Sequence, residues 1–333
     1  MLKAGLKRSL GLVVLCLGLN VFAAEKITLV VSGIDKLIYL PAKLAEQLGY
    51  LEETGLDIEL LSEAAGSNAE TEMLSGVAQG VIGFYDHTLS LQARGKLVQS
   101  VVQLAHAPGE AILASTAGKI RGAADFKGRT LGVTGLGSST YHLTRYIAAQ
   151  AGLKPAEYTL APVGAGTSFI AAMERGEIDA GMTTEPTIST LLSTRSATVF
   201  VDLRTQETTR AALGGSYPAA CLYMPTAWIN RHEEQVRKIA QAFVKTLRYI
   251  QTHGGEEIAD QMPRSFHGAD RALYVRAIDE SRQMFTADGI MPEDGPATVL
   301  EVLRVSDRSL DGKSINLANT FSNRFVEKPI QAP

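Results

Sequence analysis

The chain has 333 residues, with 32 Lys and Arg against 35 Asp and Glu, a net charge of −3 at neutral pH. Residues 1–24 hold three of the basic residues and no acidic one, so the rest of the chain carries 29 − 35 = −6. An acidic chain lacks the basic surface that nucleic acids and anionic membranes require, so we exclude both as partners. The hydrophobic content of 45% suffices for one or two buried cores.

Residues 1–24 have the three-part pattern of a secretory signal peptide. Basic residues come first, an apolar run covers residues 10–19, and small residues follow up to Ala23 and Ala24. The run is shorter than the roughly 20 residues that span a bilayer, which argues against a membrane anchor. We expect export to the periplasm with cleavage near Ala23/Ala24. Cleavage would leave Cys221 as the one cysteine, so no intrachain disulfide is expected.

After the leader, strand and helix patterns alternate. Continuous β-branched and leucine runs predict buried strands, and apolar residues four apart predict helices. The predicted strands are 27–31, 57–61, 81–85 and 98–104, and the predicted helices are 39–48, 69–78 and 88–94. This order indicates a parallel sheet with right-handed crossovers. Residues 110–115 are extended again, and we expect them to cross to a second lobe.

The same pattern restarts at Gly128. Met73 and Gly76 of the first half are echoed by Met173 and Gly176 of the second. The predicted strands here are 130–134, 158–163, 178–183 and 199–203, with helices from Ser138 to the stop at Gly152 and over 167–175. We therefore predict two similar α/β lobes.

The rest of the chain is predicted to return to the first lobe. Residues 219–224 are extended and are expected to be the second crossing. Helices are predicted over 231–252, 270–285, 296–305 and 321–326, the first with a long apolar face. The resulting division is 1–24 signal peptide, 25–110 first lobe, 111–204 second lobe, and 205–333 return crossing with C-terminal helices on the first lobe.

Residues 129–152 predict a seat for an anion. A strand ends in a turn with Gly135 and Gly137, and a helix then opens at Ser138 and Ser139. The first N–H groups of a helix have no partner within it and lie at the positive end of its dipole. The glycine spacing matches neither the dinucleotide fingerprint nor a P-loop, which disfavours a nucleotide. An ordinary helix cap is the alternative interpretation.

Four segments of the chain carry a family resemblance. They are YLPAKLAEQLGYLEETGLDIEL, DFKGRTLGVTGLGSSTYHLTRYIAAQAGL, AAMERGEIDAGMTTEP and the long helix from Arg231. They resemble the NMT1/THI5-like periplasmic substrate-binding proteins of ABC importers for sulfonate, nitrate, taurine and thiamine-precursor pyrimidines. The resemblance implies the type II periplasmic-binding-protein fold, an α/β fold of two lobes joined by two hinge crossings. It also implies a small-molecule ligand in the cleft, an ABC permease and its ATPase subunit as partners, a monomer, and no cofactor.

Candidate ligand-binding residues are those expected at the cleft edges of the sheets, where ligands of parallel sheets bind. Ser138, Ser139 and Thr140 would hold an anionic head group, and His142 would either donate to the ligand or cap the surface. The other candidates are Gly33, Tyr39, Asn68, Tyr85, His87, Thr167 and Glu185. A buried carboxylate at Glu185 would select an amine on the ligand, as in a zwitterion or an amino-heterocycle.

Two neighbouring residues, Asp86 and His87, raise other possibilities. Asp86 is expected to cap the helix from Thr88, and the pair lacks the further ligands that a metal site needs, so no metal is expected. The binding-protein interpretation requires no catalytic residue. An enzyme of the same fold, a desulfinase or small-acid lyase using Cys221 or His87, is the alternative, together with a pyrimidine-precursor binding protein or a periplasmic sensor.

Overall fold

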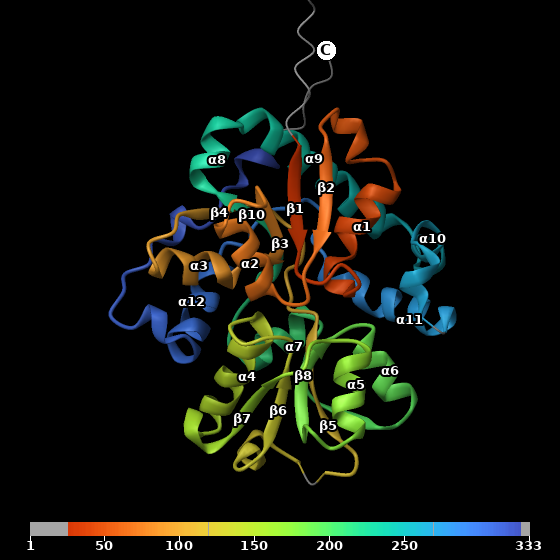
Figure 1. The fold of residues 1–333 in the computed structure, drawn as a ribbon, viewed down its shortest axis with the longest axis vertical. Coiled ribbons are helices and arrows are strands. Elements are labelled where there is room, and N and C mark those ends of the chain that lie inside the picture. The colour runs from red at the N-terminus through yellow and green to blue at the C-terminus, as the bar shows by residue number, and fades with distance from the viewer. Residues whose placement is uncertain (1–25, 119, 269, 328–333) are drawn as a thin grey trace, which may run out of the picture.

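The computed structural model describes residues 26–118, 120–268 and 270–327, so the predicted signal peptide lies outside the described residues. Two α/β lobes lie one above the other (Figure 1). Each is built on a five-stranded sheet, with strand orders β2-β1-β3-β10-β4 and β7-β6-β8-β5-β9. The predicted fold class is confirmed.

The first lobe contains the first four strands of the described chain and one later strand. Its strands are β1 (Ile27–Val31), β2 (Ile58–Ser62), β3 (Gly80–Phe84), β4 (Val98–Gln103) and β10 (Ala220–Pro225). Its early helices are α1 (Leu40–Gln47), α2 (Gly66–Leu74) and α3 (Asp86–Ala93). β1 pairs in parallel with β2 and β3, as predicted, whereas β10 runs antiparallel between β3 and β4. All five residues of β1 are buried, because helices cover both faces of the sheet.

The second lobe repeats this arrangement. Its strands are β5 (Glu110–Ser115), β6 (Thr130–Val133), β7 (Thr159–Pro162), β8 (Ala180–Thr184) and β9 (Ala197–Leu203). Its helices are α4 (Ser139–Gln150), α5 (Thr167–Glu174), α6 (Thr187–Ser193) and α7 (Gln206–Leu213). Here β5 is the antiparallel strand, between β8 and β9. α6 and α7 were not predicted.

The two segments expected to cross between the lobes are strands instead. Residues 110–115 form β5 in the second sheet, and the predicted 219–224 corresponds to β10 in the first. The crossings precede them, within residues 104–109 and 204–219. Both strands are apolar and enter the interior of a sheet, where neighbours on either side satisfy their backbone groups. Each lobe therefore receives one strand from the chain as it arrives from the other lobe.

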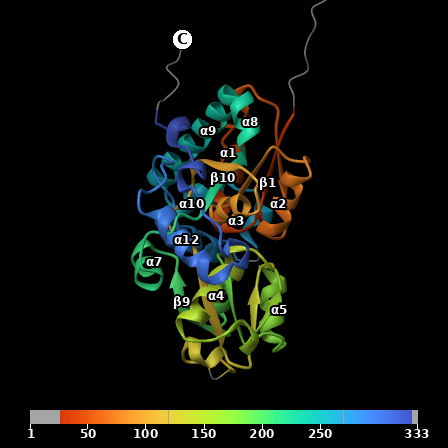
Figure 2. The same ribbon diagram turned by 90° about the vertical axis from the view of Figure 1, so that its left-hand side faces the viewer.

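Helices of the last third cover the first lobe. They are α8 (Thr226–Arg231), α9 (Glu233–Thr252), α10 (Gly255–Gln261), α11 (Arg271–Ser281) and α12 (Gly295–Ser306). The apolar face of α9 packs on α1 and β4, which explains its strong sequence pattern. α12 contacts α3 and also α4 of the second lobe, and Figure 2 shows these segments side by side. The predicted helix at 321–326 is only a 3-10 turn over Asn323–Phe325.

Candidate functional site

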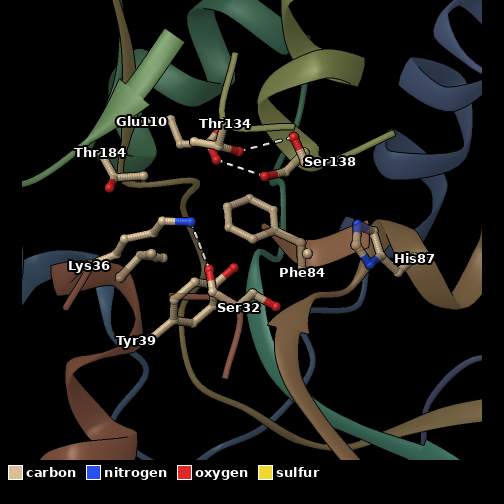
Figure 3. A pocket seen from close by; sticks show the side chains of 12 residues that line it. Ser32, Lys36, Tyr39, Phe84, His87, Glu110, Thr134, Ser138 and Thr184 are labelled. Atoms are coloured by element: carbon tan, nitrogen blue, oxygen red, sulfur yellow. Dashed lines mark hydrogen bonds between the residues drawn. The ribbon is translucent and has the colours of Figure 1, made fainter. Parts of the chain in front are cut away.

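A small cavity lies between the lobes at the edges where the strands end (Figure 3). The first lobe contributes Ser32, Lys36, Ile38, Tyr39, Gly66, Phe84 and His87. The second lobe contributes Glu110, Thr134, Ser138, Ser139 and Thr184. Its volume is about 10 Å³, the space of one water-sized sphere. The lobes are therefore closed on one another in this structure.

Lys36 brings a positive charge to the cavity. Its Nζ donates to the carbonyl oxygens of Ser32 at 2.7 Å and Ala64 at 2.8 Å. Gly33 has φ +111°, and a Cβ there would lie 2.5 Å from Cε of Lys36, so glycine allows the lysine to fold back over the turn. Burial is the main cause that lowers the pKa of Lys36 to about 8.

Glu110 faces the cavity from the first position of β5 and is 1% exposed. Its Oε1 accepts a hydrogen bond from Ser139 Oγ at 2.7 Å, while its Oε2 has no hydrogen-bond partner among the residues that the structure describes. Burial raises the pKa of the Glu110 carboxyl to about 8, against the opposing effect of the Ser139 bond. A carboxyl with a pKa near 8 is mostly protonated at neutral pH. Ligand groups that donate to Oε2 would stabilise its ionised form.

The start of α4 forms the wall opposite Lys36. Ser138 Oγ donates to the carbonyl oxygen of Gly135 at 2.6 Å and is hydrogen-bonded to Thr134 and Thr140. Its hydroxyl therefore holds the turn together, and no side chain caps the first N–H groups of the helix. These N–H groups remain the donors that the sequence predicted for an anion.

His87 closes one side of the cavity. Its Nδ1 lies 3.1 Å from Tyr223 Oη, and its Nε2 has no hydrogen-bond partner within the described part of the chain. A Cβ at Gly66 would come within 2.6 Å of its Cε1, so the absence of a side chain there leaves room for the imidazole.

Asp86 differs from its predicted role. It is fully buried, and neither carboxylate oxygen has a hydrogen-bond partner among the described residues. Helix α3 starts at Asp86 and not at Thr88, so the carboxylate lies inside the first turn and makes no cap bond. His87 Nε2 is 3.9 Å from its Oδ1.

The structure divides the predicted site residues into two groups. Tyr39, His87, Ser138 and Ser139 line the cavity together. The others lie outside its lining. Thr140 accepts from the N–H of Thr134 behind the turn, and Gly33 gives room to Lys36. Tyr85 is buried and bonded to Thr320, and Glu185 pairs with Arg204. Asn68 and Thr167 are exposed, and His142 lines a neighbouring groove.

Several lining residues were missed by the sequence analysis. Ser32, Phe84, Thr134 and Thr184 end or directly follow strands, so the rule for strand ends could have found them. Lys36 and Glu110 had no such signal. Glu110 begins a segment taken for a crossing, and Lys36 reaches the cavity only because its side chain folds back over Gly33.

A second hollow, which we call the outer groove, adjoins the cavity at His87. Its volume is about 550 Å³. It is lined by residues of α2, α3 and α4, by the last residue of α12, and by residues 307–309 that follow it. The side chain of His87 faces both spaces.

Comparison with known proteins assigns the family. The model of the NMT1/THI5-like family matches residues 39–257. The chain belongs to this family. A solved structure from Bordetella bronchiseptica RB50 is 34% identical, covers 90% of this chain and 95% of that one, and has a TM-score of 0.87. The alkanesulfonate-binding protein SsuA of Xanthomonas axonopodis pv. citri, bound to MOPS, is 17% identical over 90% of this chain and 98% of that one, with a TM-score of 0.71.

The NMT1/THI5-like chain thus has the type II periplasmic-binding-protein fold. A curated relative is named as an enzyme. The 4-amino-5-hydroxymethyl-2-methylpyrimidine phosphate synthase THI13 of Saccharomyces cerevisiae is 28% identical over 238 residues, 68% of each chain. Within residues 26–118, 120–268 and 270–327, no helix has the length and apolar character to cross a membrane. The same residues contain no cluster of three His, Cys, Asp or Glu placed to hold a metal ion.

Proposed function

We propose that this chain is the exported solute-binding component of an ABC import system. It would capture a small organic anion or zwitterion between its lobes in the periplasm and present it, as a monomer, to a membrane permease and its ATPase subunit. The likeness to SsuA supports a solute-binding role. The observation that carries the proposal is the cavity itself. Polar atoms from both lobes, Ser32 Oγ, His87 Nε2 and Glu110 Oε2, are buried in it without a hydrogen-bond partner in the part of the chain that the structure describes.

The chemistry of the walls favours a zwitterion. Lys36 and the uncapped start of α4 would bind its anionic group, and Glu110 Oε2 would accept from its amine or ring N–H. Glu110 thus takes the role that the sequence analysis gave to Glu185, whose carboxylate is already bonded to Arg204 at 3.1 Å.

Closure explains how so small a cavity could serve a solute. Ligand sites for organic molecules usually measure about 300–1,000 Å³. The solute would therefore enter with the lobes apart and hold them further apart than in this structure, and that solute-bound form would be the state that the permease recognises.

The test is a thermal-shift screen of residues 25–333 with sulfonates, taurine, nitrate, aromatic acids and aminopyrimidines. A ligand at 100 times its dissociation constant should stabilise the fold by about 2.7 kcal/mol. Lys36→Met and Glu110→Gln should each weaken the best hit about tenfold or more, whereas Lys127→Met, at a lysine with a 70% exposed side chain, should not. Binding that is equal in all three variants would refute the assignment, as would a screen without hits.

A synthase is the second candidate. The yeast relatives carry that name, and Lys36 offers an amine with a pKa of about 8 in the cavity that His87 also lines. Cys221 is less suited as a nucleophile, because it is fully buried in β10 and burial raises its thiol pKa. Mass spectrometry of the best hit after incubation separates the two functions. An unchanged solute supports binding alone, and a product or an adduct on Lys36 supports an enzyme.

A further inference from the structure

The outer groove is a positively charged hollow on an acidic protein. Its charged lining consists of Glu70, Asp307, Arg94, Arg145 and Arg308. Its size of about 550 Å³ is that of a small-molecule site, and it is open while the lobes are closed. It also spans the lobes, because α4 belongs to the second and the other lining elements to the first.

The two acids of the outer groove already have partners. Glu70 accepts from Arg94 at 2.8 Å. Asp307 accepts from Ser90 Oγ at 2.6 Å and from the N–H of Ser309 at 2.8 Å. Glu70 thus offsets Arg94, whereas the donors to Asp307 are neutral, so its charge offsets one of the other two arginines and the lining keeps one positive charge in excess.

Arg145 is a cation without a counter-ion. No carboxylate of the described residues lies within 4 Å of it, and the side chains that it interacts with are those of Tyr141 and Tyr158. Its Nη1 donates to Tyr141 Oη at 2.7 Å, and its guanidinium lies 5.3 Å from the centre of that ring. These contacts hold the side chain in place, while its Nε is buried and has no hydrogen-bond partner in residues 26–118, 120–268 and 270–327. A fixed guanidinium with unused N–H donors suits a carboxylate, sulfonate or phosphate.

Two further side chains support an anion here. Arg308 is exposed and, within the described part of the chain, has no carboxylate within 4 Å. His142 is 6% exposed, and its Nδ1 has no hydrogen-bond partner among the described residues. Burial lowers its pKa, so a neutral imidazole with an unsatisfied nitrogen faces the groove.

We propose that the outer groove is a second binding site, for an anionic group held by Arg145 and assisted by Arg308. The group is a carboxylate, sulfonate or phosphate, either as a free ion or as the anionic end of a solute that extends past His87. The site goes beyond the solute cavity and does not depend on it, because the two share only His87.

Calorimetric titration tests the site with three probes, inorganic phosphate, sulfate and glutarate. Arg145→Gln should weaken saturable binding about tenfold, and Arg308→Gln roughly threefold. The matched control is Arg175→Gln, which removes an exposed arginine of the same lobe that pairs with Glu177 and should leave affinity unchanged. Binding should also weaken with added salt. Absence of saturable binding for every probe, or equal affinity of Arg145→Gln and Arg175→Gln, would overturn the proposal.

The source of the anion is then decided by competition with the best hit of the solute screen. If the solute's own end occupies the groove, phosphate competes with it and Arg145→Gln weakens the solute as well. If the groove takes a free ion, both bind together and the affinity for solute is unchanged. Phosphate binding with no solute hit would leave the groove assigned and refute only the solute cavity.

Discussion

The backbone N–H of Leu37 donates to the carbonyl oxygen of Glu185 at 3.0 Å, and this bond joins the lobes beside the cavity. The side chain of Glu185 extends the junction. Its carboxylate accepts from Arg204 at 3.1 Å, and Arg204 lies 3.6 Å from Glu280 of α11 in the first lobe. The backbone bond and the contact of Arg204 with Glu280 therefore hold the lobes together. The same Arg204 also compensates the buried carboxylate of Glu185.

Arg204→Gln should destabilise the protein. It leaves the Glu185 carboxylate, 2% exposed, without its cation, and we expect a loss of about 2 to 4 kcal/mol in the free energy of unfolding, measured in urea. The double variant Glu185→Gln/Arg204→Gln should recover part of this loss. Glu280→Gln is the control, since its side chain is 60% exposed, and should cost less than about 1 kcal/mol. An equal loss of unfolding free energy in Arg204→Gln and Glu280→Gln would contradict the prediction.

Glu110 should make stability fall with rising pH. Its pKa is about 8 in the folded protein, against 4.5 as the ordinary value, so the folded state keeps a proton that the unfolded chain loses between these two pH values. Glu110→Gln removes the titrating carboxyl and with it this pH dependence of the free energy of unfolding. Its stability relative to the wild type should rise with pH by up to about 1.4 kcal/mol per unit from pH 5 to 8, measured by urea unfolding. Parallel pH curves for the two proteins would show that the carboxyl titrates normally.

Gly181→Ala should damage the second sheet. A Cβ at this position of β8 would lie 2.7 Å from the carbonyl oxygen of Gly132, in the neighbouring β6. Backbone cannot move aside as a side chain would, so we expect a loss of about 1–3 kcal/mol, seen as a lower melting temperature. Gly122→Ala, where nothing lies within 4 Å, should change stability by less than about 0.5 kcal/mol.

Cys221 should be unreactive until the protein unfolds. It is fully buried in β10, and burial raises the pKa of its thiol. In a protein that comprises residues 25–333, a disulfide reagent such as DTNB should label no thiol in the native state and one thiol per chain in urea. Rapid labelling of the native protein would show that the site opens to solvent and would reopen its use as a nucleophile.

Local pattern predicted much of the fold. β1 is a continuous apolar run and is buried throughout, and α9 has apolar residues along one face, which is the buried face. Apolar patterns of this kind indicate which residues are buried. The predictions failed where the apolar pattern is short, or where the same pattern fits more than one type of secondary structure. α2 starts at Gly66, three residues before the helix predicted over 69–78, and α6 and α7, of seven and eight residues, were not predicted.

The sequence by itself determined two α/β lobes, their order along the chain, and a polar helix start at Ser138 and Ser139, because each depends on neighbours within a few residues. Only the tertiary structure decided that β5 enters the second sheet and carries Glu110 to the cavity that Lys36 enters from the first lobe. It likewise placed Arg145 of α4 in the outer groove, where no carboxylate of the described residues lies within 4 Å of it. Contacts between residues far apart in the chain depend on how whole elements pack, and local periodicity does not carry that information.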